Sequence, residues 1–206
     1  HRSGDVGLDS GRRDDGTLIL SARAPLAPYE RNLLRRFWSH GETQAQKTWI
    51  AERDGEGWLR LSYGQARTDV SAVATWLKAQ GVAPGRSILV LSGNTLAHAL
   101  WMFGAMAAGV PICSVSTNYS LLSADFERLR NVVDLVKPAV IFAETADYAR
   151  AAEAIAPDDA IIVTGAPDAF AGEAVDMAEV LWAPDVAGGG RAGEAGDPTA
   201  ARRHLR

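Results

Sequence analysis

The sequence has few of the features that mark secreted, membrane-spanning or nucleic-acid-binding proteins. Its single cysteine, Cys113, excludes an internal disulfide framework and is typical of a reducing cytoplasm. No apolar run approaches the roughly 18 residues of a membrane helix, because a histidine, two glycines and a proline interrupt the longest candidate, Leu96 to Val115. With a net charge of −4 and no long basic run, the sequence argues against nucleic acid as a partner.

The two ends of the sequence differ in composition from its centre. Residues 1–17 are highly charged, lack the apolar core of a signal peptide and are expected to be a disordered lead-in. Because the chain begins with His1 rather than methionine, we expect a fragment or a processed product. Residues 183–206 are rich in Gly, Ala and Arg and are expected to be disordered. Either the reading frame was lost near Ala183, or this tail is a natural linker.

Residues 18–182 have the composition and patterning of a folded α/β domain. Of the 206 residues, 47% are hydrophobic and 22% are charged, which is ordinary for a protein with a real core. A helix over 29–40 is followed by a hairpin of strands 48–51 and 58–62, and a capping box, Ser62 to Gln65, opens a helix that stops at Gly81. Strands and helices then alternate, with strands at 87–92, 110–115, 139–143 and 160–163 and helices at 95–108, 123–137 and 145–156. This order predicts a mostly parallel sheet with helices on both faces.

The turn after the first buried strand, Gly93-Asn94, resembles a phosphate-binding turn because a helix follows it. A phosphate cradle normally uses several glycines, and here Gly93 stands alone without a following Gly-Lys-Ser/Thr. The simpler interpretation is that Gly93 permits the bend and Asn94 caps the helix.

Two other glycine patterns match nucleotide motifs only by spacing. Gly104 and Gly109 are spaced as in a Walker loop, but Val-Pro follows where Lys-Ser/Thr is needed, so Gly109 is better explained as a helix C-cap. Gly188, Gly190 and Gly193 satisfy G-x-G-x-x-G, yet no strand precedes them and no helix pattern follows.

Three further positions are candidate site residues. Cys113 lies in an apolar strand, where a cysteine usually packs as a small core residue, although His98 could act as its base. The loop at Tyr119-Ser120 follows a strand end, which is where ligands gather in open α/β sheets; its composition also suits a plain connector. No cluster of Cys, His and carboxylates has metal-ligand spacing.

Several stretches together resemble one family. LSYGQA, LKAQGVAPGRSILVLSGN and AMAAGVPICSVSTNYS are similar to the N-terminal part of the acyl-adenylate-forming (AMP-binding) enzymes, a superfamily of acyl- and aryl-CoA synthetases, luciferases and peptide-synthetase adenylation domains. The sequence departs from the family pattern at Gln65-Ala66 (Glu-Leu), Arg86 (Asp) and His98 (an acid), none of which contacts the adenylate in the family. Over Leu18 to Ile162, the chain resembles the feruloyl-CoA synthetases in particular.

The resemblance implies an ATP-dependent two-step ligase. A carboxylic acid such as a hydroxycinnamate would attack the α-phosphate of ATP, with Mg²⁺, and coenzyme A would displace AMP from the acyl-adenylate. The family's phosphate loop, T-S-G-S-T-G-x-P-K, its ribose-binding aspartate and its catalytic lysine match no position here. We therefore assign no catalytic, cofactor-binding or metal-binding residue and expect the chain alone to be inactive and to bind no cofactor.

Two alternatives remain open. The chain could be a non-catalytic binding module of the same fold, or a small enzyme of another class that uses Cys113. Neither the acyl substrate nor the oligomeric state follows from the sequence. An α/β sheet cut partway would leave an edge and apolar faces uncovered, so we expect aggregation or loose packing.

Overall fold

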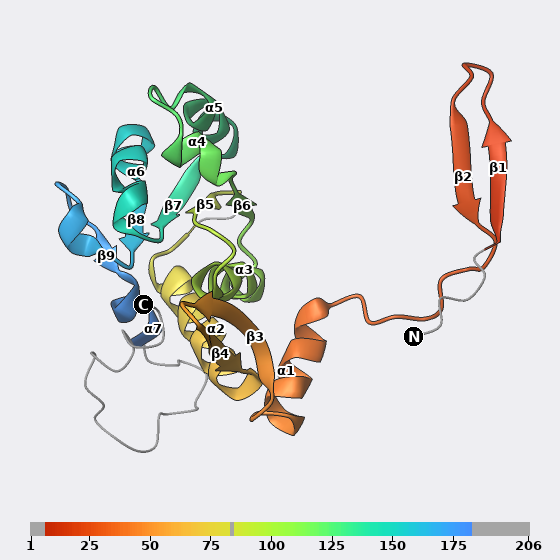
Figure 1. Cartoon of the computed structure of the whole chain (residues 1–206), viewed down its shortest axis with the longest axis horizontal. Coiled ribbons are helices and arrows are strands. Elements are labelled where there is room, and N and C mark those ends of the chain that lie inside the picture. The colour runs from red at the N-terminus through yellow and green to blue at the C-terminus, as the bar shows by residue number, and fades with distance from the viewer. Residues whose placement is uncertain (1–6, 83–84, 183–206) are drawn as a thin grey trace.

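The centre of the protein is a five-stranded parallel sheet (Figure 1). The computed structural model describes residues 7–82 and 85–182. In space the strands follow the order β6-β5-β7-β8-β9. Their bounds are β5 Ser87–Leu91, β6 Ile112–Ser114, β7 Pro138–Ala143, β8 Ile161–Thr164 and β9 Val175–Asp176. The predicted α/β class, with its parallel sheet, is confirmed.

Strand β5 shows why the sheet strands are almost continuously apolar. Successive side chains of a strand point to opposite faces. Ile88 and Val90 belong to the hydrophobic cluster on one face of the sheet, and Leu89 and Leu91 belong to the cluster on the other. All four are at most 1% exposed. A strand covered on both faces cannot alternate apolar and polar residues, so a continuous apolar run marks it in the sequence.

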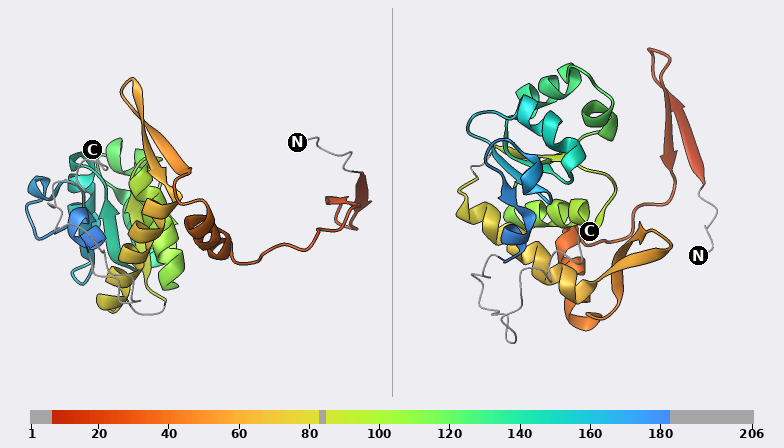
Figure 2. Two further views of the ribbon diagram at one scale, coloured as in Figure 1. Left: turned by 90° about the horizontal axis from the view of Figure 1, so that it is seen from below. Right: turned by 60° about the vertical axis from the view of Figure 1, so that its left-hand side comes forward.

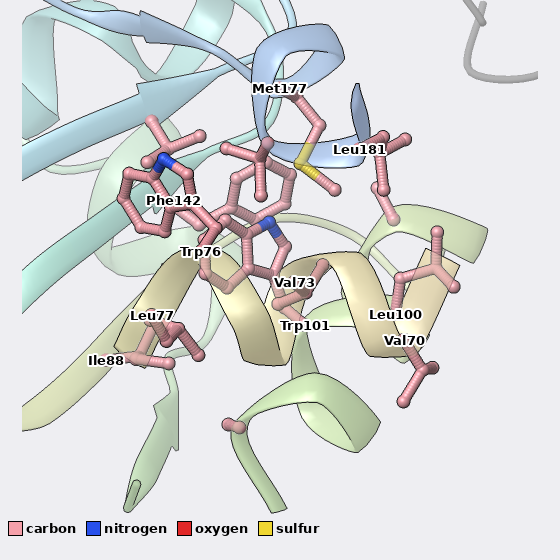
Figure 3. Packing of buried hydrophobic residues seen from close by; sticks show 14 of the residues in the cluster. Val70, Val73, Trp76, Leu77, Ile88, Leu100, Trp101, Phe142, Met177 and Leu181 are labelled. Carbon is pink, nitrogen blue, oxygen red and sulfur yellow. The ribbon is translucent and has the colours of Figure 1, made fainter. Parts of the chain in front are cut away.

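Helices cover both faces of the sheet, as predicted. One cluster receives its helical residues from α1 (Leu33–Thr43), α2 (Tyr63–Ala79), α3 (Leu96–Ala108) and α7 (Met177–Trp182). The other receives them from α5 (Glu127–Val136) and α6 (Ala149–Ile155). In the first, the indole rings of Trp76 and Trp101 meet edge to face with centroids 6.0 Å apart, and Trp101 packs on Phe142 at 5.4 Å. Figure 3 shows Met177 of α7 over these rings.

The segment before the sheet contains α1 (Leu33–Thr43) and the predicted hairpin, formed by β3 (Thr48–Asp54) and β4 (Gly57–Ser62). Helix α1 begins later than expected because the Asn32 side chain accepts a hydrogen bond from the Leu34 backbone N–H and caps it there. The capping box is confirmed on its N-cap side, since Ser62 Oγ accepts from the Gln65 N–H at 3.2 Å.

The lead-in expected to be disordered, residues 1–17, contains strand β1 (Leu8–Arg12) in its described part. This strand forms an antiparallel hairpin with β2 (Leu18–Ala22). Figures 1 and 2 show it away from the body of the molecule. Backbone hydrogen bonds and the exposed Arg23–Asp9 ion pair (2.7 Å) hold it, and every side chain of both strands is exposed. The segment was expected to be disordered because it has few apolar side chains to bury. Its order comes instead from backbone pairing around the Asp15-Gly16 turn.

Further differences concern short elements. Residues 117–121, expected as a loop, form helix α4 (Thr117–Leu121), and the helix expected over 145–156 is a 3₁₀ turn (Ala146–Tyr148) followed by α6. A second 3₁₀ turn spans Pro167–Ala169. Neither β9 nor α7 was predicted. The tail expected to be disordered or out of frame, residues 183–206, lies outside the described residues.

Candidate functional site

The carboxyl edge of the sheet is the natural place to look for a site. The chain passes from β5 to β6 on one side, then crosses back past β5 to β7 and continues in the opposite direction. In open α/β sheets, ligands bind beyond the carboxyl ends of the strands, at the point where the strand order reverses. Here that point lies between β5 and β7.

A connected group of polar residues occupies this position, and we call it the His98 cluster: Ser92, Gly93, His98, Ser114, Glu52 and Glu144. Ser92 and Glu144 directly follow β5 and β7, and Ser114 ends β6. His98 lies in the first turn of α3. Its Nδ1 is 2.9 Å from both Ser92 Oγ and the Gly93 carbonyl oxygen, and its Nε2 is 2.7 Å from Ser114 Oγ.

These partners assign the proton of the neutral imidazole ring. The Gly93 carbonyl oxygen can only accept, so Nδ1 carries the hydrogen. The Ser92 hydroxyl donates to the same carbonyl at 3.1 Å, which leaves its lone pairs free to accept from Nδ1. Nε2 is then an acceptor, and the Ser114 hydroxyl donates its proton to it.

Two carboxyl groups lie beside the first turn of α3. A Glu52 oxygen accepts from the Leu96 N–H at 2.6 Å, and a Glu144 oxygen accepts from the Gly93 N–H at 3.3 Å. Burial raises the pKa of the Glu144 carboxyl above its ordinary value. The negative charge of Glu52 also raises this pKa, while hydrogen bonds from Thr95 and Gly93 oppose the rise.

The turn that leads into α3 differs from its prediction in two details. Thr95 rather than Asn94 caps the helix, because its hydroxyl accepts from the His98 N–H at 3.2 Å. Gly93 does not have the positive φ that only glycine adopts easily, and a Cβ there would make ordinary contact with Thr95 Cγ2 at 3.7 Å. The turn is therefore built by side-chain and backbone hydrogen bonds rather than by glycine.

The structure does not pair Cys113 with His98. The imidazole instead bonds Ser114, the next residue along β6, whose side chain points to the opposite face of the strand. Cys113 is half-buried against the second hydrophobic cluster, and burial raises the pKa of its thiol. A raised pKa keeps the thiol protonated and unreactive, as expected for a core cysteine.

The Tyr119 segment borders a hollow of about 360 Å³. Its lining residues are Ser116, Asn118, Tyr119, Leu122, Ser123 and Arg128. The Arg128 guanidinium lies over the Tyr119 ring at 5.8 Å from its centroid. Ser120 does not line the hollow; it is buried, and its hydroxyl has no hydrogen-bond partner among the described residues. Of the two predicted positions, only Tyr119 faces a space that a ligand could enter.

The glycines of the rejected nucleotide motifs have structural roles where they are described. Gly109 ends α3 with φ at 74°, which confirms the C-cap. Gly104 lets α3 approach α2, since a Cβ there would lie 2.4 Å from Val73 Cγ1. Gly188, Gly190 and Gly193 lie outside the described residues.

Within residues 7–82 and 85–182, no group of three or more His, Cys, Asp and Glu residues could hold a metal ion. In the same part of the chain, none of the helices is long and apolar enough to cross a membrane.

Sequence reasoning missed most of the His98 cluster. Ser92, Ser114 and Glu144 are far apart in the sequence, and only the strand order brings them together. Each of them nevertheless stands at or just after the end of a predicted strand. That position is a usable signal once the strands are known to be parallel neighbours.

Comparison with known proteins identifies the family. Residues 37–198 match the family described as AMP-binding enzyme. No curated protein sequence matches the chain.

Solved structures share the fold. A benzoate CoA ligase from Burkholderia xenovorans LB400 has a TM-score of 0.61 at 21% identity, over 82% of this chain and 32% of the ligase. Acetoacetyl-CoA synthetase from Streptomyces lividans has a TM-score of 0.58 at 18% identity, over 75% of this chain and 25% of the synthetase. A fatty acyl-adenylate ligase from L. pneumophila has a TM-score of 0.54 at 18% identity, over 65% of this chain and 23% of that ligase. The chain thus spans about a third or less of each of these proteins. Because the family match covers most of its length, the chain belongs to the AMP-binding enzyme family.

Proposed function

We propose that this chain is the N-terminal part of an ATP-dependent aryl- or acyl-CoA synthetase. The reaction joins a carboxylic acid to AMP, with release of pyrophosphate, and then transfers the acyl group to the thiol of coenzyme A. The observation that carries the proposal is the family match over residues 37–198. The solved structures that share the fold include a benzoate CoA ligase and an acetoacetyl-CoA synthetase, which are of the same reaction class.

Within that class, we propose an aromatic acid of the hydroxycinnamate type as substrate. The support is the resemblance of residues 18–162 to feruloyl-CoA synthetases, together with a benzoate CoA ligase among the structural neighbours. We also propose a role in phenylpropanoid catabolism, on the basis of this substrate, and a cytoplasmic location, which the single half-buried cysteine supports.

We further propose that these 206 residues provide scaffold rather than nucleotide chemistry. The turn at Gly93 is held by Thr95, Glu52 and Glu144, so its backbone N–H groups at positions 93, 96 and 98 already have partners. A phosphate would have to displace two carboxyl groups and a hydroxyl to reach them.

The test joins residues 1–182 to the remainder of a feruloyl-CoA synthetase and measures pyrophosphate release with ferulate, benzoate and acetate. We expect release with the aromatic acids and little with acetate, and no release by the 206-residue chain alone. Circular dichroism and a cooperative melt establish that the fusion folds. A folded fusion that releases no pyrophosphate with any acid would refute the proposal.

A non-catalytic binding module is the second candidate, and the open hollow beside Tyr119 and Arg128 favours it. The 206-residue chain of such a module would bind an aromatic acid, which isothermal titration with ferulate measures, and the fusion would be inactive. Binding of ferulate without pyrophosphate release would favour the module, and pyrophosphate release by the fusion would exclude it.

A further inference from the structure

The Ser114–His98 pair has the geometry of a nucleophile and its base. Ser114 Oγ lies 2.7 Å from His98 Nε2, within the range of a hydrogen bond from a catalytic hydroxyl to a general base. Ser114 is exposed, so an incoming molecule can reach its hydroxyl. The proposed ligase chemistry uses neither residue.

The imidazole ring is fixed in the orientation that this role requires. The Gly93 carbonyl oxygen and Ser92 Oγ both lie 2.9 Å from Nδ1 and keep the proton on that nitrogen. Nε2 is therefore free of hydrogen and faces Ser114. In a Ser-His-Asp triad a carboxylate holds Nδ1–H in this way; here a backbone carbonyl and a hydroxyl do so.

The surroundings favour the charge that would develop on the ring. A base that takes the serine proton becomes an imidazolium. The Glu144 carboxyl interacts electrostatically with His98, and Glu52 lies close enough to Glu144 to influence it. Negative charge on these carboxyl groups would stabilise the imidazolium.

We propose that Ser114 and His98 form an acyl-accepting site for activated aryl esters. Ser114 Oγ bonds to the ester carbonyl carbon while its proton passes to His98 Nε2. The bond between that carbon and the phenolate oxygen then breaks, and the phenolate leaves with the electron pair. The imidazolium returns its proton to the phenolate or to water, and Ser114 is left as an acyl ester that water can hydrolyse. Aryl esters suit the site because a phenolate leaves readily.

The test treats the full chain with p-nitrophenyl acetate and follows p-nitrophenolate release. Mass spectrometry of the digested protein then locates the acetyl group. We expect one acetyl group on Ser114 and a rate about 100-fold above that of Ser114→Ala and of His98→Gln, which is the usual contribution of a general base. Ser39→Ala is the matched control, because Ser39 is an exposed serine of α1 that belongs to neither the His98 cluster nor the hollow beside Tyr119, and this variant should react like the unmodified chain.

Acetylation in the unmodified chain is read directly at Ser114, so the proposal stays testable if a variant fails to fold. Acetyl groups on other residues but not on Ser114 would overturn it. An equal rate in a folded Ser114→Ala variant would also overturn it. Neither result bears on the ligase proposal, which rests on pyrophosphate release.

Discussion

Glu144 is a carboxyl group whose protonation is tied to folding. Its pKa is raised, mainly by burial, so the folded protein holds this proton more tightly than the unfolded chain does. The stabilisation is fully present below the ordinary value of 4.5 and is lost as the pH rises through the folded-state pKa.

Glu144→Gln tests this linkage, because glutamine keeps an oxygen that can accept from the Gly93 N–H but does not ionise. We expect the variant and the parent chain to unfold at similar temperatures near pH 4. As the pH rises toward about 7, the variant should unfold at a higher temperature than the parent, because the parent loses the stabilisation that its proton provides. Thermal melts at several pH values measure this difference. Glu173→Gln, at an exposed site, is the control, and its melting temperature should differ from that of the parent by the same amount at every pH. A pH-independent difference for Glu144→Gln as well would contradict the linkage between Glu144 and folding.

The substitution Gly104→Ala tests how closely α2 and α3 pack. A methyl group at this position would lie 2.4 Å from Val73 Cγ1 and 2.6 Å from Val73 Cβ, so one of the helices must shift. We expect Gly104→Ala to lower the free energy of unfolding by about 1–3 kcal/mol, as overpacking does. Denaturant titration measures it.

The matched partner is Val73→Gly, which removes both Cγ1 and Cβ, the two atoms that the new side chain would meet. In that background, Gly104→Ala should cost much less, since contacting residues do not act additively. Gly172→Ala, where a Cβ would meet open space, serves as the neutral control. Equal costs in both backgrounds would show that Val73 is not the obstacle.

Arg86 shows what a departure from the family pattern can do. Where the family has an acid, the Arg86 guanidinium donates to the carbonyls of Lys137 and Pro138 and to the Asp159 carboxylate at 2.8 Å. This ion pair raises the pKa of Arg86 and lowers that of Asp159. The arginine thus joins the starts of β5, β7 and β8 at the edge of the sheet opposite the His98 cluster.

Among the elements, the β1–β2 hairpin contributes least to the body of the protein. Neither hydrophobic cluster contains a residue before Leu34. The pairing places Leu8 opposite Ala22 and Leu20 opposite Ser10, so one face of the hairpin is largely apolar and exposed. A two-stranded hairpin without a packed face is only marginally stable in water.

Deleting residues 1–22 should therefore leave the sheet intact. We expect the free energy of unfolding to change by no more than about 0.5 kcal/mol, the range of surface changes. Chemical denaturation of the shortened and full chains measures this change. Fluorescence of Trp76 and Trp101 is a suitable signal, because both indoles are buried in the core. A loss of several kcal/mol would mean that the hairpin packs on the body in solution.

The elements that could be predicted are those with a strong local signal. The capping box at Ser62 and the buried run of β5 were found because propensity and periodicity agree there. Helix α7 carries Met177, Val180 and Leu181 at helical spacing, but it is only six residues long and its burial depends on α2. Strand β9 has two residues and exists only by pairing with β8.

At the scale of the whole molecule, the fold could be predicted from local sequence signals, but the site could not, because it depends on which strands are neighbours. Alternating strands and helices predict a parallel sheet, but the alternation does not reveal that β7 lies beside β5 rather than beside β6. That neighbour relation places Glu144 next to Gly93 and completes the His98 cluster. The expected aggregation of the chain stays a prediction, which a sharp cooperative melt of a monomer would contradict.

The central claim is that this chain is the scaffold part of an adenylating ligase and does not itself hold the nucleotide. Isothermal titration of the purified, folded chain with ATP and Mg²⁺, and separately with ferulate, tests the claim most directly. We predict no saturable heat with ATP. Saturable ATP binding would contradict the account, because it would place a nucleotide site within these 206 residues.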